Sequence, residues 1–196
     1  MAPPRKHREA IVDAAVRLFR QKGYAATGLA DIVEASGAPK GSLYHYFAGG
    51  KPAIGEAAVR EAGRRVLVTV RDLGAKAGSA GELVRAHAEL LANWMAQSGY
   101  RDGAPMTTVL LENAPQHPGI TEAGREAHEA WTAELKARLQ ADGVDGARAA
   151  RLASLTIAAL EGALVQARIE QSSRPLVVAA EELDSLYHAA RMGCSD

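Results

Sequence analysis

The hydrophobic positions of this 196-residue chain recur at helical spacing along almost its whole length. Between residues 5 and 22, Ile11, Ala15 and Phe19 lie on one apolar stripe, charged residues occupy the opposite side, and Gly23 follows. Apolar residues spaced four apart share one face of an α-helix, and a glycine directly after such a run ends it. No segment shows the strict alternation typical of a strand. The pattern predicts an all-α protein.

Two short helices are predicted next, around residues 29–35 and 40–47, and Pro52 opens a longer one. Proline suits a first helical turn because its φ is already helical and its missing N–H is not needed there. A glycine-rich segment at residues 73–81 is the best candidate for a boundary or hinge. Five further helices are predicted over residues 82–97, 106–113, 121–141, 147–170 and 176–191.

These elements predict a three-helix N-terminal head, residues 1–51, and a larger helical body, residues 52–196, whose residues 52–73 form a connecting helix. The head contains eight Lys and Arg residues against four Asp and Glu, a net charge of +4, and the neutral total leaves the body at −4. The head is therefore where an anion would bind. Four charges over fifty residues are not extreme, so charge alone leaves nucleic-acid binding open.

The composition bears on where in the cell the protein is expected. The basic first eight residues are not followed by an apolar segment, and no apolar run approaches the roughly 18 residues of a membrane span. The single cysteine, Cys194, cannot form an intrachain disulfide. We expect a cytoplasmic protein that does not act at a membrane.

The segment "GAPKGSLYHYFAGGK", residues 37–51, concentrates the candidate chemistry. "LADIVEA", the turn "SGAP" and "KGSLYHYF" have the lengths of a helix-turn-helix. With Leu43 and Phe47 directed inward, a rotation of 100° per residue directs Gly41, Tyr44 and His45 outward. This outward face has hydrogen-bond donors and no acidic side chain, and an α-helix of this kind fits the major groove of DNA.

Other residues near this helix are candidates for phosphate contacts. Gly41 weakens a short helix by about 1 kcal/mol relative to alanine, which is understandable if the backbone approaches a phosphate closely. Lys40 and Lys51 lie at the two ends of this helix. Thr27 either caps the start of the helix predicted at residues 29–35 or donates to a phosphate. Tyr46 falls on the apolar side and is expected in the core. For Tyr44, His45 and Lys51, an ordinary surface position is the alternative.

Two rival functions fit the sequence less well. "EAHE" at residues 126–129 and "HAE" at residues 87–89 lack further metal ligands at useful spacing, and no nucleophile motif is present. "GGK" at residues 49–51 is not a phosphate loop, because Pro52 replaces the required Ser or Thr. We therefore predict no enzyme activity, cofactor or metal. A helical interaction module without DNA function is disfavoured by the basic head and its donor-rich helix face.

"AIVDAAVRLFRQKGYAATGLADIVEASGAPKGSLYHYFAGGK", residues 10–51, resembles the DNA-binding head of the TetR family of transcriptional regulators. "GSLYHYF-x-G-G-K", "DGAPMTTVLLE" and "AALEGALVQARIEQSSRPL" are similar to its LmrA/YxaF-like subgroup. The resemblance implies a homodimeric repressor, with a ligand-binding body, that binds a double-stranded DNA operator. At the matching positions it implies DNA contacts by Thr27, Lys40, Gly41, Ser42, Tyr44, His45 and Lys51.

Three positions depart from the family pattern. Pro39 stands where Ser or Thr is frequent, which removes one phosphate contact. Ala104 replaces a cysteine common in the subgroup, so no thiol acts there. Pro52 replaces a frequent glutamate, which we interpret as a variation of the helix start.

A dimer would read a pseudo-palindromic operator, with its recognition helices about 34–36 Å apart or somewhat more. We expect the last two helices to form the dimer surface, although their small-residue patch is also compatible with packing inside one subunit. The candidates are Ala158, Ala159, Gly162, Ala163, Leu183, Leu186 and Tyr187.

A small apolar or aromatic effector is expected in the body, because binding pockets are mostly apolar with few polar groups. The candidates are Trp94, Met95, Met106, Thr107, Leu110, Leu111, Glu112, Asn113, His128 and Trp131, each also compatible with ordinary packing. Glu112 favours a cationic or hydroxyl-bearing ligand if it faces the pocket, and is otherwise a surface charge. We expect ligand binding to move the connecting helix, with glycines 74, 78 and 81 absorbing part of the movement. Activation instead of repression is the alternative that the sequence leaves open.

Overall fold

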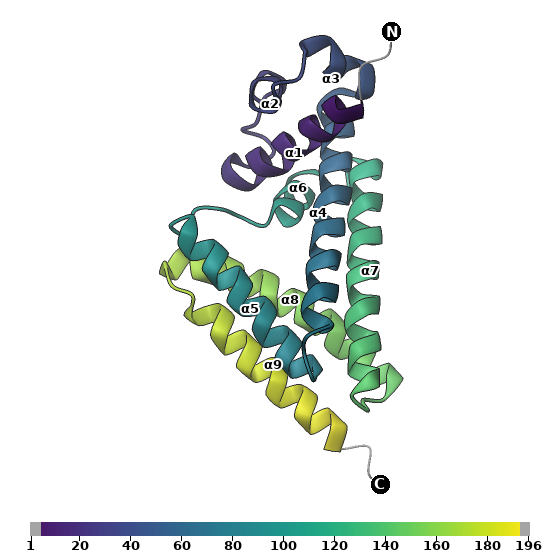
Figure 1. Ribbon diagram of the computed structural model, residues 1–196, viewed down its shortest axis with the longest axis vertical. Helices are drawn as coiled ribbons and strands as arrows, with labels where there is room; N and C mark the ends of the chain where they lie inside the picture. Colours follow the sequence, from purple (N-terminus) through teal and green to yellow (C-terminus); the bar gives the residue numbers. More distant parts are fainter. Residues whose placement is uncertain (1–4, 193–196) are drawn as a thin grey trace. The chain divides into compact units, whose positions relative to one another are not determined.

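The computed structural model describes residues 5–192 as nine α-helices, with no strand in this range, and confirms the predicted all-α class (Figure 1). Cys194 lies outside the described residues. The helices are α1 (Arg5–Lys22), α2 (Leu29–Ser36), α3 (Lys40–Tyr46), α4 (Gly50–Gly74), α5 (Ala80–Gln97), α6 (Pro105–Asn113), α7 (Pro118–Ala141), α8 (Gly146–Glu170) and α9 (Arg174–Met192).

Helices α4 to α9 each begin one to three residues earlier than the apolar pattern predicts. Capping and proline explain the difference. Ser79 accepts a hydrogen bond from Glu82 N at the start of α5, and Asp145 accepts from the amides of Ala147 and Arg148 at the start of α8. α6 and α7 each begin at a proline, whose missing N–H is harmless in a first turn. These polar and proline positions begin the helices before their apolar faces do.

The chain forms two compact units, and α4 and α7 contribute residues to both. The first unit comprises residues 1–65 and 103–128, and the second comprises residues 66–102 and 129–196. The expected boundary between a DNA-binding head and a ligand-binding body, after residue 51, stays a prediction. The glycine-rich segment lies inside the second unit, where Gly81 is buried in α5 and an added Cβ would lie 1.6 Å from Asp184 Oδ1. An alanine at this position would displace the Asp184 carboxylate, which pairs with Arg85.

The first unit is built on the stripe predicted for α1. Ile11, Ala15 and Phe19 are fully buried, and α1 packs against α2, α3 and α6. Leu43 from α3 and Met106 from α6 belong to the same apolar cluster. Burial of these large side chains, at about 25 cal/mol per Å² of apolar surface, is the main stabilising contribution to the unit.

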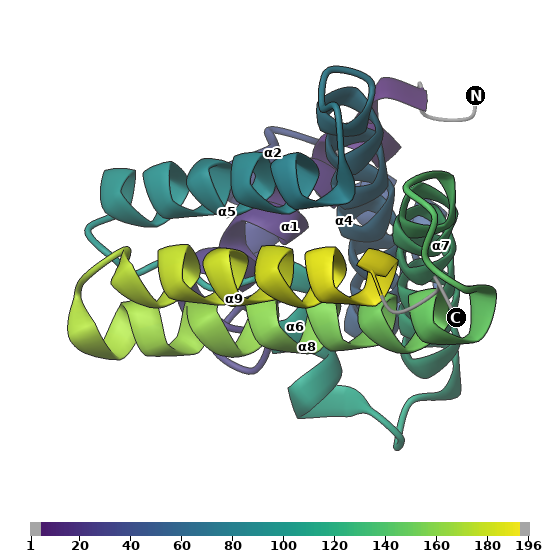
Figure 2. The ribbon, with the colours of Figure 1, turned by 90° about the horizontal axis from the view of Figure 1, so that it is seen from below.

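The second unit is built on α5, α8 and α9, which run side by side (Figure 2). Met95, Leu152 and Leu183 are buried in its apolar cluster, to which α7 adds Trp131. Tyr187 Oη shares a hydrogen bond with Thr156 Oγ1 inside this cluster. The polar atoms of both side chains are thereby satisfied.

Helix α8 is long and apolar enough, by length and composition alone, to cross a membrane, in contrast to the expectation from the sequence. Its buried face accounts for this composition. Leu152, Ile157 and Leu160 lie in the cluster of the second unit, and α8 packs against α9. A core helix meets the same criterion, so the apolar composition of α8 is weak evidence for a membrane span.

Candidate DNA-binding, effector and dimer sites

Helices α2 and α3 form the predicted helix-turn-helix, joined by three residues, 37–39, instead of four. Gly37 has a φ of +61°, a left-handed conformation that favours glycine, and its N–H donates to Glu34 O. Leu43 in α3 is fully buried, and Phe47, the residue that follows the end of α3, is 4 % exposed. This packing fixes which face of α3 is turned to solvent.

The outward face of α3 is the predicted one. Lys40, Gly41, Tyr44 and His45 are exposed, and Tyr44 keeps 53 % of its surface accessible. No acidic residue lies on α3. A Cβ added to Gly41 would meet no atom within 4 Å, so nothing inside the chain requires a glycine there. The face has donors, positive charge and room for a close backbone approach.

Two predicted contacts, Thr27 and Ser42, are buried instead of exposed. The Thr27 hydroxyl donates to Gly23 O at 2.7 Å, so the expected capping role of Thr27 is wrong. The N-cap of α2 is Gly28, whose N–H donates to Asp31 Oδ2 at 3.0 Å. A DNA contact through either hydroxyl would require a different local arrangement.

Lys51 is directed toward the loop between α1 and α2. Its Nζ donates to Ala25 O at 3.2 Å and lies 4.4 Å from the centre of the Tyr24 ring. Burial lowers the pKa of the Lys51 ammonium, while the Glu112 carboxylate acts in the opposite direction. The predicted phosphate contact by Lys51 therefore competes with contacts inside the chain.

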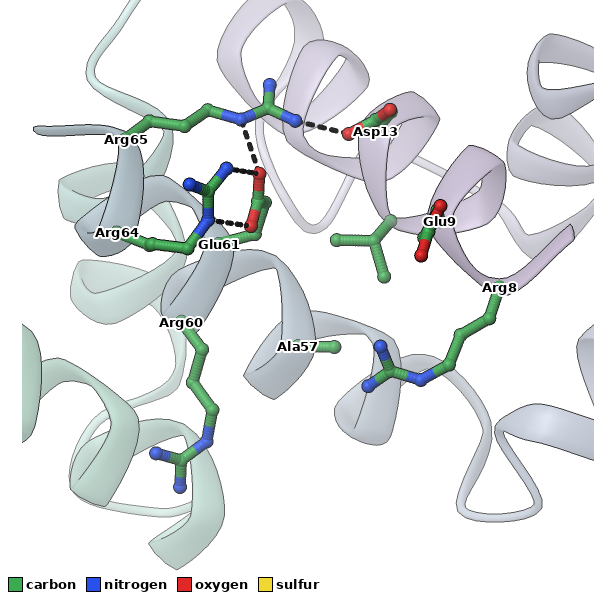
Figure 3. Close-up of a pocket in the computed structure, with 9 residues that line it drawn as sticks. Arg8, Glu9, Asp13, Ala57, Arg60, Glu61, Arg64 and Arg65 are labelled. Atoms are coloured by element: carbon green, nitrogen blue, oxygen red, sulfur yellow. Dashed lines mark hydrogen bonds and ion pairs between the residues drawn. The ribbon is translucent and has the colours of Figure 1, made fainter. Parts of the chain in front are cut away.

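A charged groove of about 570 Å³ lies between α1 and α4 (Figure 3). Glu61 accepts hydrogen bonds from Arg64 at 2.8 Å and from Arg65 at 2.7 Å, and Arg65 also pairs with Asp13 of α1. The hydrogen bond from Arg64 is the main reason that the pKa of Glu61 is lowered to about 2. The pairs of Glu61 with Arg64 and Arg65 have the i,i+3 and i,i+4 spacing of a helix. The pair of Arg65 with Asp13 joins α1 to α4 across 52 positions, which no local pattern in the sequence indicates.

Seven effector candidates lie in the first unit and three in the second. In the first unit, Met106 is buried in the core, the Asn113 amide donates to Val109 O, and Leu111 is 80 % exposed. Thr107 and Leu110 are partly buried on the same helix, and His128 Nδ1 lies 3.0 Å from Gly124 O. Glu112 accepts hydrogen bonds from the amides of Tyr24 and Ala25. Glu112, Asn113 and His128 thus have hydrogen-bond partners inside the first unit.

In the second unit, Met95 is buried, Trp94 is partly buried and Trp131 is 6 % exposed. The rings of Trp131 and His87 meet edge to face at 5.8 Å, and Trp131 Nε1 has no hydrogen-bond partner among the described residues. Burial lowers the pKa of His87 to about 4, so its imidazole is neutral at pH 7. The sequence analysis considers His87 only in the rejected metal motif "HAE", and its place beside Trp131 was not predicted.

The dimer candidates divide into exposed and buried groups. Ala158, Gly162 and Leu186 are exposed and Ala159 is partly so, whereas Ala163, Leu183 and Tyr187 are buried in the core of their own unit. The exposed α8 candidates belong to a groove of about 530 Å³ on α8 and α9. It is lined by Ala158, Ala159, Gly162, Ala163, Gln166, Glu170, Arg174, Pro175, Val178 and Ala179.

Comparison with known proteins agrees with this geometry. Residues 11–58 match the family described as bacterial regulatory proteins, tetR family, and residues 80–182 match the transcriptional regulator LmrA/YxaF-like C-terminal domain. The HTH-type transcriptional regulator LmrA of Bacillus subtilis is 31% identical over 170 residues, covering 87% of this chain and 90% of that protein. An HTH-type regulator of Mycobacterium tuberculosis is 32% identical over 188 residues, covering 93% and 94%.

The fold is also that of solved regulators. The structure of a TetR regulatory protein from Rhodobacter sphaeroides superposes with a TM-score of 0.78 at 23% identity, covering 91% of this chain and 97% of that one. The matched families and relatives are transcriptional regulators, not enzymes. This chain belongs to the TetR family of helix-turn-helix transcriptional regulators, with a C-terminal domain of the LmrA/YxaF-like type.

Proposed function

We propose that the protein is a cytoplasmic repressor that binds a pseudo-palindromic operator as a homodimer and is released by a small apolar or aromatic effector. The observation that carries the DNA-binding part is the exposed face of α3, where Lys40, Gly41, Tyr44 and His45 lie together without an acidic neighbour on the helix. Such a face supplies donors to phosphates and base edges in the major groove. Fluorescence anisotropy on duplexes from the protein's own upstream DNA, against scrambled duplexes, tests it.

Tyr44→Ala and Lys40→Ala are each expected to weaken operator binding by about tenfold, since a direct contact contributes about 1–3 kcal/mol. Lys40→Ala should also reduce the slope of log K against log salt by about one, because one phosphate contact is lost. Lys76→Ala, which removes an exposed lysine of the second unit, is the matched control. Parental affinity in both α3 variants would contradict the assignment of α3 as the recognition helix.

The groove on α8 and α9 supports the dimer proposal. Gly162 lies in the middle of α8, where glycine costs about 1 kcal/mol, yet an added Cβ would meet nothing within 4 Å. Close approach by a second helix would account for this glycine. Leu155 and Ile169 are exposed, and each lies seven residues from Gly162. If two α8 helices crossed antiparallel at Gly162 on a twofold axis, Leu155 of one subunit would lie against Ile169 of the other.

Ala158→Arg is expected to raise the dimer dissociation constant by roughly 100-fold, because a long charged side chain replaces a small one where two helices would approach closely. Circular dichroism should stay parental, since Ala158 is exposed in the single chain. Ala133→Arg places the same charge on an exposed position of α7 and serves as the control. Sedimentation velocity across a concentration series measures the outcome, and an unchanged dimer in Ala158→Arg would contradict this interface.

An effector with an apolar body and a hydrogen-bond acceptor fits the second unit, because Trp131 offers an unpartnered N–H within an apolar cluster beside neutral His87. Release then follows as a population shift: the effector must bind the non-operator geometry more tightly, with a coupling of about 1–3 kcal/mol. Since α4 contributes residues to both units, it is our candidate for the moving element. Effectors would be found by loss of anisotropy in a screen of aromatic compounds on the operator complex, and a compound that instead strengthens binding would indicate a co-repressor.

A further inference from the structure

The loop between α1 and α2 directly precedes the helix-turn-helix and is held by a residue distant in sequence. Glu112, in the last turn of α6, accepts a hydrogen bond from Tyr24 N at 3.0 Å through Oε1 and from Ala25 N at 2.6 Å through Oε2. Both carboxylate oxygens are thus engaged by two successive backbone amides. All three residues belong to the first compact unit.

The local backbone is shaped for this contact. Gly23 has a φ of +87°, a left-handed conformation that side chains disfavour, and a Cβ there would lie 3.1 Å from Glu112 Oε1. Glycine at this position both permits the turn and leaves room for the carboxylate. Hydrogen bonds from amides to an ionised carboxylate are stronger than those between neutral groups.

The loop is held on its other side as well. Lys51, at the start of α4, donates to Ala25 O and lies over the Tyr24 ring, so the amide and the carbonyl of Ala25 are both engaged. The segment before α6 is also attached to α1, because Gly103 N donates to Arg20 O at 2.9 Å. Two hydrogen-bonded contacts therefore connect this region to α1. The segment before α6 is bonded to the end of α1, and the last turn of α6 is bonded to the loop that follows α1.

We propose that Glu112 is a positioning residue for operator binding, through which α6 fixes the loop that leads into the helix-turn-helix. This inference rests on the proposed function, since it requires that the helix-turn-helix binds an operator. Loss of the two hydrogen bonds frees the Tyr24–Ala25 backbone and lowers the fraction of molecules in which α2 and α3 hold the operator-binding geometry.

Glu112→Gln tests the proposal with little change of shape. Glutamine keeps one acceptor oxygen, but its amide group presents a donor to the second backbone N–H. We expect operator affinity to fall by about 5- to 10-fold, the lower part of the range for coupled sites. The salt slope should stay parental because no phosphate contact is lost. Hydrogen exchange followed by NMR should accelerate at the Tyr24 and Ala25 amides.

Glu122→Gln is the matched control, because Glu122 also lies in the first unit and pairs with Arg125 on its own helix. Glu112→Ala, which removes both acceptors, should exceed Glu112→Gln in every effect. Parental operator affinity in Glu112→Gln and Glu112→Ala, or unchanged exchange at both amides, would overturn the inference. A parent protein that binds no operator would overturn the proposed function and this inference with it, so the two failures are told apart by the parent's own titration.

Discussion

Gly63→Ala is expected to destabilise the protein by about 1–3 kcal/mol, the usual cost of an overpacked core position. Gly63 is buried in α4, and a Cβ there would lie 2.5 Å from Ala127 Cβ and 3.5 Å from Ala127 Cα. Helices α4 and α7 run side by side in Figure 1. Because Ala127 has no flexible side chain that can move aside, the two helices themselves must separate. This cost exceeds the gain of about 1 kcal/mol in helix propensity.

Gly74→Ala is the matched control for this prediction. Gly74 ends the same helix, and an added Cβ would make an ordinary contact of 3.8 Å with Leu83. Alanine should therefore stabilise the protein slightly, by about 0.4–1 kcal/mol, through the lower entropy of the unfolded chain. Urea unfolding of the parent, Gly63→Ala and Gly74→Ala measures whether each substitution lowers or raises the free energy of unfolding. Equal stability of Gly63→Ala and Gly74→Ala would show that the α4–α7 contact relaxes without cost.

The features predicted correctly from the sequence are those encoded in neighbouring residues. The Ile11, Ala15 and Phe19 stripe predicts the buried face of α1 because helical geometry alone places these side chains together. The same rule applies to α3, where burial of Leu43 is sufficient to turn Tyr44 to solvent. Helix starts were less accurate, because caps and prolines lie outside the apolar pattern.

The features that could not be predicted depend on which partner a residue meets. Periodicity indicates that Leu183 and Tyr187 lie on an apolar face of α9, but not whether that face packs inside the subunit or against a second copy. In the structure both are buried in their own unit. Glu112 lies 87 and 88 positions from the amides that it binds, and no local pattern connects them. The residues assigned to the effector site carry the same ambiguity, since a buried Trp or Met can line a binding pocket or simply pack in the core.

His87 should make the stability of the protein depend on pH between about 4 and 6.5. His87 is 5 % exposed, and burial alone lowers its pKa from 6.5 to about 4. In this interval the unfolded chain binds a proton that the folded chain does not, so stability is complete above pH 6.5 and falls as the pH decreases toward 4. At about 1.4 kcal/mol per pH unit, the loss attributable to His87 is roughly 3 kcal/mol at pH 4.

His87→Leu should remove this contribution while keeping an apolar side chain of similar size beside Trp131. Relative to their difference at pH 7, the variant should gain about 2 kcal/mol over the parent at pH 5. His45→Leu, at an exposed position of α3, is the control. Glu61, whose pKa is lowered to about 2 chiefly by Arg64, affects stability mainly below pH 4.5, so the two effects occupy different parts of the titration. Parallel pH profiles of unfolding for His87→Leu and the parent would mean that the His87 ring reaches water, and the cluster that we assign to an apolar effector would then be hydrated.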